Sequence, residues 1–469
     1  MGKYYLAVDI GASSGRHILG HLENGKIKLE EIYRFENGMD HKDGKLLWNV
    51  DRLFGEILNG MKKCKELGKI PVSMAIDTWA VDYVLLDAQD RILGDTYGYR
   101  DHRTDGMDAE VAKILPETEL YAKTGIQKQI FNTIYQLMAV KEKEPELLQR
   151  AKTLLMLPDY FGFRLTGNKL SEYTNGSTTQ LVNPNTFQWD TDLIRKLGYP
   201  EDIFLPLQMP GTKVGQLLPE IQKEVGFNLE VVLCGSHDTA SAVMAVPQAS
   251  GDGIYISSGT WSLMGIESLK PIINKDAAAA NFTNEGGYDH RFRFLKNIMG
   301  LWMIQSVRHE YNDAYSFAQL CEMAEDSRDF PSRVDVNDQS FLSPDSMVEA
   351  IKQYCQKTGQ PVPESVGELT SVVYRSLAQS YGETVSGLEK IAGRTYDSIH
   401  IIGGGSNAAY LNQLTADATG KTVYAGPGEA TAIGNLLAQM IHAEELADLK
   451  SARKCVRESF EIRTFDPEK

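Results

Sequence analysis

A carboxylate and a histidine stand side by side in the middle of the chain, directly after an apolar segment. Ser236–Ala242 reads Ser-His-Asp-Thr-Ala-Ser-Ala and follows a strand predicted over Val231–Cys234. Asp238 could accept the proton of a hydroxyl group that attacks a phosphoryl centre, and His237 could hydrogen-bond a polyol. The alternatives are structural: Asp238 could cap a helix predicted over 239–246, since acids are common at helix starts, and His237 could be a satisfied core histidine.

Three turns rich in glycine, serine and threonine could bind phosphate or nucleotide groups. They are Asp9–Arg16, Ser257–Ser262 and Gly403–Ala408. Small residues let backbone N–H groups approach a phosphate closely, and Arg16 adds a charged donor. Asp9, at the end of a predicted strand, could hold the metal ion that accompanies a nucleotide. Plain structural turns remain the alternative for all three segments.

The third turn also fits a different chemistry. Gly403–Ala408 satisfies the loose dinucleotide pattern G-x-G-x-x-G/A, with Glu429 roughly twenty residues further on. A dinucleotide-dependent oxidoreductase is therefore a second hypothesis, although the motif stands unusually late in the chain. Gly420–Thr422 does not complete a phosphate-binding P-loop, because Thr415 stands where that motif needs glycine.

Strands and helices alternate in both halves of the chain. In the first half, apolar patterning predicts a helix over Asp51–Leu67 and strands over Tyr4–Ile10, His17–His21, Lys26–Phe35, Val72–Ile76 and Tyr83–Leu86. Residues 105–219 are predicted to be mostly helices and loops. In the second half, we expect strands over Ile254–Ser257, Ser262–Ile266, His400–Ile402 and Thr422–Ala425, and helices over Glu368–Ile391, Asn407–Thr419 and Ala430–His442.

The strand–turn–strand plan of the N-terminus recurs near residue 254. This repetition predicts an α/β protein with two domains of related plan, 1–247 and 248–469. The boundary is expected within 246–252, a stretch of Pro, Gln, Ser and Gly.

Composition and charge exclude several classes of protein. The 469 residues are 42% hydrophobic and 24% charged, as in ordinary globular proteins, and the net charge of −15 argues against binding to nucleic acid or an anionic membrane surface. The five cysteines form no CxxC pair, so neither a disulfide framework nor a structural zinc is expected. With no apolar run near the length of a membrane span, we expect a cytoplasmic protein without an obligate protein partner.

Taken together, these segments resemble the FGGY carbohydrate kinases. The resemblance runs through nearly the whole chain and is carried by Asp9–Arg16, Ile76–Asp82, Tyr99–Asp101, Leu157–Tyr160, Glu172–Asn175, Ser236–Ala242, Ser257–Gly265, Asn284–Gly287, Lys296–Trp302 and Gly403–Gln413. It implies the actin-like ATPase fold, with two ribonuclease-H-like domains and a catalytic cleft between them. The match is sharpest to members that phosphorylate L-rhamnulose in L-rhamnose catabolism, because the first turn reads Gly-Ala-Ser-Ser-Gly-Arg and a His precedes the candidate base. Ala80 departs from the glycine of those members, and its methyl group would tighten the sugar pocket.

The resemblance also implies roles for individual residues. Asp238 would be the general base that takes the proton of the sugar's C1 hydroxyl. The residues expected to bind ATP are Ala12, Ser13, Ser14, Gly15, Arg16, Thr260, Gln305 and Gly404. The residues expected to bind the sugar are Ala80, His237, Asp238, Thr239 and Asn297. Asp9 would lie near Mg²⁺. A kinase for L-fuculose or D-xylulose, or a non-metabolic ATPase of the same fold, remains the alternative.

Overall fold

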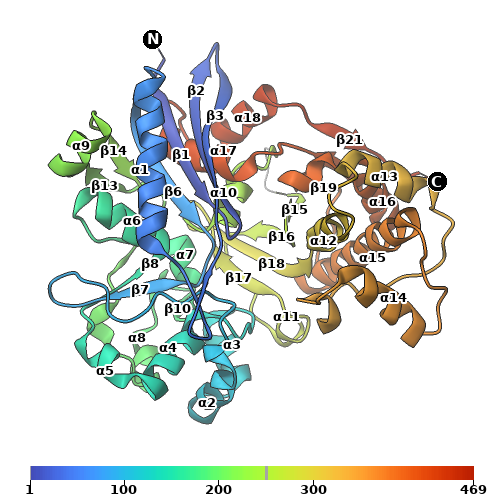
Figure 1. The fold of residues 1–469 in the computed structure, drawn as a ribbon, viewed down its shortest axis with the longest axis horizontal. Coiled ribbons are helices and arrows are strands. Elements are labelled where there is room, and N and C mark those ends of the chain that lie inside the picture. The colour runs from blue at the N-terminus through green and yellow to red at the C-terminus, as the bar shows by residue number, and fades with distance from the viewer. Residues whose placement is uncertain (1, 249–251, 469) are drawn as a thin grey trace. The chain divides into compact units, whose positions relative to one another are not determined.

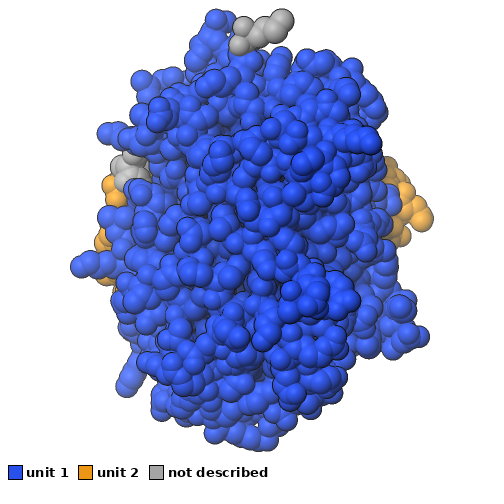
Figure 2. All heavy atoms as spheres, turned by 90° about the vertical axis from the view of Figure 1, so that its left-hand side faces the viewer, with its two compact units in different colours: residues 1–245, 268–294, 431–459 blue, residues 246–267, 295–430, 460–469 orange. Residues whose placement is uncertain are grey.

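The computed structural model describes residues 2–248 and 252–468, which form two compact units. Unit 1 comprises residues 1–245, 268–294 and 431–459, and unit 2 comprises 246–267, 295–430 and 460–469 (Figure 2). Two segments from the second half of the chain therefore belong to unit 1. The predicted boundary, 246–252, includes residues 249–251, which lie outside the described residues.

Unit 1 is built on a six-stranded mixed sheet (Figure 1). Its order is β13 (Lys213–Gln216), β14 (Glu230–Val232), β6 (Pro71–Thr78), β1 (Tyr4–Ile10), β2 (Ser14–Glu23) and β3 (Lys26–Glu36). β1 pairs with β2 in antiparallel and with β6 in parallel orientation, so that Asp9 lies opposite Arg16 on one side and Asp77 on the other. The turn before β2 covers only three residues, and β2 consequently begins earlier than the predicted strand.

Two helices with apolar faces cover the unit 1 sheet. α1 (Val50–Glu66) is capped by Asn49 and buries Leu53, Ile57 and Met61 in the core of this sheet. This helix follows the predicted periodicity, which is typical of an amphipathic surface helix. α17 (Ala430–His442) contributes a second apolar cluster against β1 and β2.

The middle of the chain is mostly helices and loops, as predicted. Its helices are α2 (Met107–Ile114), α3 (Glu117–Thr124), α4 (Thr133–Lys143), α5 (Pro145–Arg150), α6 (Leu157–Thr166), α7 (Tyr173–Ser177), α8 (Thr191–Leu197) and α9 (Pro219–Val225). Short strand pairs join them, including β7 (Tyr83–Leu86) with β8 (Thr153–Met156).

Unit 2 repeats the strand plan of unit 1. Its strands are β18 (Phe292–Met299, with its first residues in unit 1), β16 (Trp261–Ser268), β15 (Ile254–Ser258), β19 (Ser398–Ile402), β20 (Thr422–Ala425) and β21 (Arg463–Phe465), in this order. β15 is antiparallel to β16 and parallel to β19, as β1 is to β2 and β6. The prediction of an α/β protein with two related sheet-containing parts is therefore confirmed.

The helices of unit 2 are α12 (Trp302–Glu310), α13 (Phe317–Asp326), α14 (Met347–Lys357), α15 (Val366–Ala392) and α16 (Ala409–Thr419). Two of them, α15 and α16, were predicted from the sequence, whereas α12, α13 and α14 were not. The helix expected from Asn407 begins two residues later, because Gly404–Asn407 forms a separate 3₁₀ turn. Within the described ranges, no helix combines the length and the apolar character that a bilayer span requires.

Candidate active site

Asp238 occupies the first position of a short helix at the end of an extended segment. α10 (Asp238–Met244) begins directly after His237, which takes the capping position without a side-chain capping bond. The backbone N–H of Thr78 donates to the Ser236 carbonyl (2.9 Å), which aligns this segment with the end of β6. The helix-cap interpretation of Asp238 is therefore wrong, because its carboxylate accepts from the adjacent Thr239 and not from a later N–H of the helix.

The carboxylate of Asp238 is engaged through one oxygen. Oδ1 accepts from the backbone N–H (2.6 Å) and the hydroxyl (3.1 Å) of Thr239 and lies 3.4 Å from Nε2 of His237. All its hydrogen bonds and ion pairs within the described residues reach Oδ1. Burial raises the pKa of Asp238, His237 opposes the shift, and the charge of Asp9 adds to it. A carboxylate with a raised pKa and one available oxygen is suited to accept a proton.

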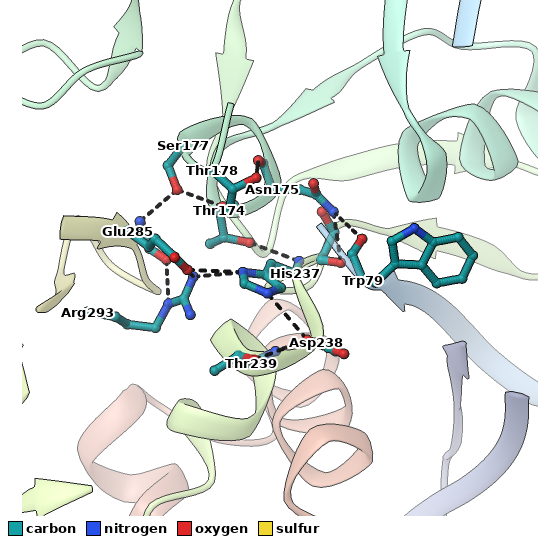
Figure 3. A network of polar contacts seen from close by, with 12 residues as sticks. Trp79, Thr174, Asn175, Ser177, Thr178, His237, Asp238, Thr239, Glu285 and Arg293 are labelled. Atoms are coloured by element: carbon teal, nitrogen blue, oxygen red, sulfur yellow. Dashed lines mark hydrogen bonds and ion pairs between the residues drawn. The ribbon is translucent and has the colours of Figure 1, made fainter. Parts of the chain in front are cut away.

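A buried chain of charges continues behind His237 (Figure 3). Nδ1 of His237 lies 3.3 Å from Oε2 of Glu285 and 3.1 Å from Nη2 of Arg293. Nη2 also lies 3.0 Å from Oε2 of Glu285, and Nε of Arg293 donates to the Gly286 carbonyl (2.8 Å). Glu285 comes from β17 (Thr283–Gly286) and Arg293 from β18. Burial alone would raise the pKa of Glu285, but Arg293 and His237 hold it below its ordinary value.

A second buried carboxylate, that of Glu172, fixes the segment that carries His237. Oε2 of Glu172 accepts from the hydroxyls of Ser236 (2.5 Å) and Thr174 (2.6 Å). The Thr174 hydroxyl in turn accepts from the His237 N–H (3.3 Å), and the Asn175 amide donates to the Ser236 carbonyl (3.4 Å). The sequence motif Glu172–Asn175 contributed to the resemblance, but no role was predicted for its residues.

Hydrogen bonds to the buried carboxylate of Asp82 fix the segment that follows Ala80. Asp82 is buried and accepts from the indoles of Trp48 (2.6 Å) and Trp79 (2.9 Å), and from Tyr99 N (3.0 Å) and the Gln136 amide (3.0 Å). Burial raises the pKa of Asp82 to about 6, although these donors oppose the shift. With four donors, Asp82 is a structural anchor for this loop.

Ala80 itself is only partly buried and precedes a strained residue. Val81 has φ 68°, a conformation that is costly for a β-branched side chain. The hydroxyl of Thr133 (2.7 Å) and the amide of Gln136 (3.2 Å) both donate to the Val81 carbonyl and fix this strained backbone. Two side chains of α4 therefore fix the backbone beside Ala80.

The first turn joins β1 and β2 as a tight hairpin. Nη2 of Arg16 forms an ion pair with Oδ2 of Asp9 (2.8 Å), so Arg16 is not simply a surface cation. Asn37 braces the turn by donating to the carbonyls of Ser13 (from its backbone N–H, 2.9 Å) and Gly11 (from its amide, 2.8 Å). Asn37 was missed because it lies at the end of a separate strand.

Carboxylates gather beside this turn. Asp77 is fully buried next to Asp9, and burial, followed by the charge of Asp9, raises its pKa well above the ordinary value. The amide of Asn435 donates to Oδ2 of Asp77 (2.6 Å), and Oδ1 of Asp77 has no hydrogen-bond partner among the described residues. Mg²⁺ commonly uses one or two carboxylates together with substrate phosphates, so the donor set fits a magnesium ion carried by a nucleotide.

The second and third turns lie together at the ends of β15 and β19 in unit 2. A methyl group at Gly405 would overlap the Ser258 side chain, and Gly403 has a positive φ of 82° beside the Ser258 carbonyl. The second turn is braced by Leu301 N, which donates to the Gly259 carbonyl (2.9 Å). The predicted ligands Thr260 and Gly404 are exposed here, and Asn297 on β18 and Gln305 on α12 are partly buried.

Comparison with known proteins identifies the family of this chain. The N-terminal domain of the FGGY family of carbohydrate kinases matches residues 4–245, and the C-terminal domain matches residues 254–443. The chain belongs to the FGGY family of carbohydrate kinases. It is therefore an ATP-dependent sugar kinase, and the oxidoreductase hypothesis finds no support.

Curated FGGY relatives match over almost their entire length. A protein named rhamnulokinase from Halalkalibacterium halodurans is 54% identical over 99% of this chain and 98% of the relative. A rhamnulokinase from Bacillus subtilis is 46% identical over 99% of this chain and 95% of the relative.

Solved FGGY structures share the fold at low sequence identity. A xylulose kinase from Lactobacillus acidophilus has a TM-score of 0.81 at 16% identity and covers 99% of this chain, with 94% of its own chain matched. A glycerol kinase from Plasmodium falciparum has a TM-score of 0.76 at 14% identity, covering 100% of this chain and 94% of its own. The fold is the actin-like two-domain fold of FGGY sugar kinases, as the resemblance implied.

Proposed function

We propose that this FGGY kinase transfers the γ-phosphoryl group of ATP to the C1 hydroxyl of L-rhamnulose. The observation that carries the choice of sugar is the likeness to proteins named rhamnulokinase, at 42–54% identity over 98–99% of the chain. L-Fuculose and D-xylulose are the competing acceptors, because ketoses of this size differ by only a few hydrogen bonds. The reaction is placed in the cytoplasm, where ATP is available.

Asp238 acts as the general base in this proposal. Its Oδ1 is held by Thr239 and faces His237, which leaves Oδ2 to accept the proton of the C1 hydroxyl as the sugar oxygen attacks phosphorus. The raised pKa of Asp238 supports this role, because it brings the carboxylate's proton affinity closer to what the step needs. Ala80, His237, Thr239 and Asn297 bind the sugar.

The nucleotide is held mainly by backbone groups. The first turn, Ala12–Arg16, and Thr260 of the second turn bind the phosphates, while Gln305 and Gly404 contact the rest of the nucleotide. Asp9 would hold Mg²⁺, which when bound would neutralise charge on the transferring phosphate. The ion pair of Arg16 with Asp9 supports this arrangement, because it fixes a cation at the rim of the turn.

A coupled ADP-release assay tests the proposal directly. The full-length protein is assayed with Mg-ATP and L-rhamnulose, L-fuculose, D-xylulose, D-ribulose or glycerol. We expect the highest kcat/KM for L-rhamnulose. A higher value for another ketose would reassign the substrate within the family, and ATP hydrolysis independent of sugar would contradict sugar kinase activity.

A further inference from the structure

The buried pair of Glu285 and Arg293 is not explained by packing alone. Arg293 is fully buried, yet its Nη1 has no hydrogen-bond partner among the described residues. A buried cation with an unsatisfied donor costs stability, and an apolar side chain would fill the same space without that cost. The other two nitrogens of Arg293 are committed to the Gly286 carbonyl, to Glu285 and to His237. Its role is therefore to be sought at the His237 ring.

The donors of Arg293 determine which ring nitrogen of His237 carries the proton. A guanidinium can only donate, and Nη2 has two hydrogens. Nη2 forms an ion pair with Oε2 of Glu285 at 3.0 Å, although Oε2 has no hydrogen-bond partner among the described residues, and the hydrogen bond of Nη2 goes to Nδ1 of His237 at 3.1 Å. Nδ1 must then be an acceptor, so the proton of the ring resides on Nε2. Nε2 is the nitrogen that lies 3.4 Å from Oδ1 of Asp238.

We propose that Arg293 and Glu285 are positioning residues that hold His237 with Nε2–H directed toward Asp238 and the sugar. The inference rests on the proposed function, since it takes Asp238 as the base. A proton on Nε2 of His237 helps to hold Oδ1 of Asp238 and leaves Oδ2 of Asp238 for the reacting hydroxyl. A sugar oxygen that approaches the ring on this side would share the same N–H with Oδ1, so we expect the substrate to present an acceptor oxygen here.

The carboxylate of Glu285 makes the arginine necessary. Without Arg293, Glu285 would be the charged neighbour of Nδ1, at 3.3 Å, and would draw the ring proton to that nitrogen. Nε2 would then present a lone pair to the Asp238 carboxylate and to the sugar. Glu285 in turn neutralises the buried charge of Arg293, whose isolated burial would be far more costly.

Two substitutions and their combination test the pair in the full-length protein. Arg293→Met removes the donor at similar length and leaves Glu285 in place. We expect kcat/KM for L-rhamnulose to fall about tenfold or more, while KM for ATP stays within about twofold. Adding Glu285→Gln to Arg293→Met removes the pull on the ring proton and should recover part of that loss.

A matched control separates positioning from stability. Glu389 in unit 2 is a partly buried carboxylate whose Oε1 lies 2.8 Å from Nζ of Lys421. Glu389→Gln should lower the melting temperature and leave both kinetic constants unchanged. If Arg293→Met does not fold, Glu285→Gln, which is nearly isosteric, provides the measurement and should lower kcat/KM for the sugar by a smaller factor.

The ring proton itself can be observed. In ¹⁵N-histidine-labelled protein, long-range ¹H–¹⁵N spectra report which nitrogen is protonated, and His237→Gln identifies the signals of His237. We expect Nε2–H in the wild type and in Glu285→Gln, and a shift toward Nδ1–H in Arg293→Met. A structural role alone would not move this signature.

The outcomes are distinguishable. Nδ1–H in the wild type, or variants that match Glu389→Gln in both kinetics and spectra, would overturn the positioning role. Absence of L-rhamnulose phosphorylation by the wild type would instead overturn the proposed function, and the spectra would still decide the state of the ring.

Discussion

In unit 1, the candidate base lies among buried charged and polar side chains, whereas in unit 2 the turns predicted to bind nucleotide are rich in glycine, serine and threonine. His237 and Glu285 are almost fully buried, but Thr260 and Gly404 are exposed. A neutral polyol must be recognised by directed hydrogen bonds, which need side chains held in place by further contacts. A polyphosphate can be held by backbone N–H groups, for which close approach matters more than side-chain chemistry. We therefore expect substitutions around the candidate base to act on the sugar and on kcat, and those in the three turns to act on ATP and on local packing.

The largest effect is expected at the base. Asp238→Asn keeps the size of the side chain but removes the proton acceptor, so kcat should fall by about 10²- to 10⁴-fold. Sugar and ATP binding, measured by calorimetry, should change little. Turnover close to that of the wild type would remove Asp238 from this role and with it the contrast between the two regions.

In the third turn, close packing against Ser258 should restrict substitution at Gly405 more than any contact with the nucleotide does. Gly405→Ala places a methyl group against the Ser258 side chain and should lower the free energy of unfolding by about 1–3 kcal/mol, measured by chemical denaturation. Adding Ser258→Gly should restore much of this loss. The neighbouring Gly404→Ala is the matched control, because nothing lies within 4 Å of its added methyl group. Gly404→Ala should leave stability unchanged and raise KM for ATP if the nucleotide approaches this backbone; equal destabilisation by both alanines would contradict the packing argument.

Arg16 tests the first turn, which lies in unit 1, whereas the second and third predicted nucleotide-binding turns lie in unit 2. Arg16→Ala should raise KM for ATP about tenfold through the loss of a charged donor, with KM for the sugar unchanged. Arg34, opposite Arg16 in the sheet and paired with Glu31, gives the control Arg34→Ala, for which no kinetic change is expected. A larger effect on the sugar than on ATP would move Arg16 out of the phosphate site.

A pH dependence of stability is expected to arise from Asp82. Its pKa in the folded protein, about 6, is higher than the ordinary 3.8, so the folded state binds the proton more tightly than the unfolded state. This contribution to stability is fully present below the ordinary pKa and is lost as pH rises through about 6. Asp82→Asn should remove a slope of up to about 1.4 kcal/mol per pH unit from the unfolding free energy between these values. Parallel curves for the two proteins in urea denaturation across this range would show that Asp82 does not titrate there.

The sequence by itself determined most of the main helices and strands, the presence of two related sheets, and the resemblance to the FGGY family. β1 and α1 follow from local apolar periodicity, and Asp9–Arg16 and Ser236–Ala242 are contiguous motifs whose chemistry can be read along the chain. Such features depend on neighbours within a few residues, and for that reason they are predictable.

Only the tertiary structure decided which distant side chains complete the site. Glu285 and Arg293 reach His237 because residues 268–294, far along the chain, belong to unit 1, and nothing in their local sequence indicates a histidine partner. Likewise, only the structure shows that Asp82 accepts hydrogen bonds from two indoles, a backbone N–H and an amide. Burial and partner geometry arise from packing between segments, so residue type and spacing alone do not specify them.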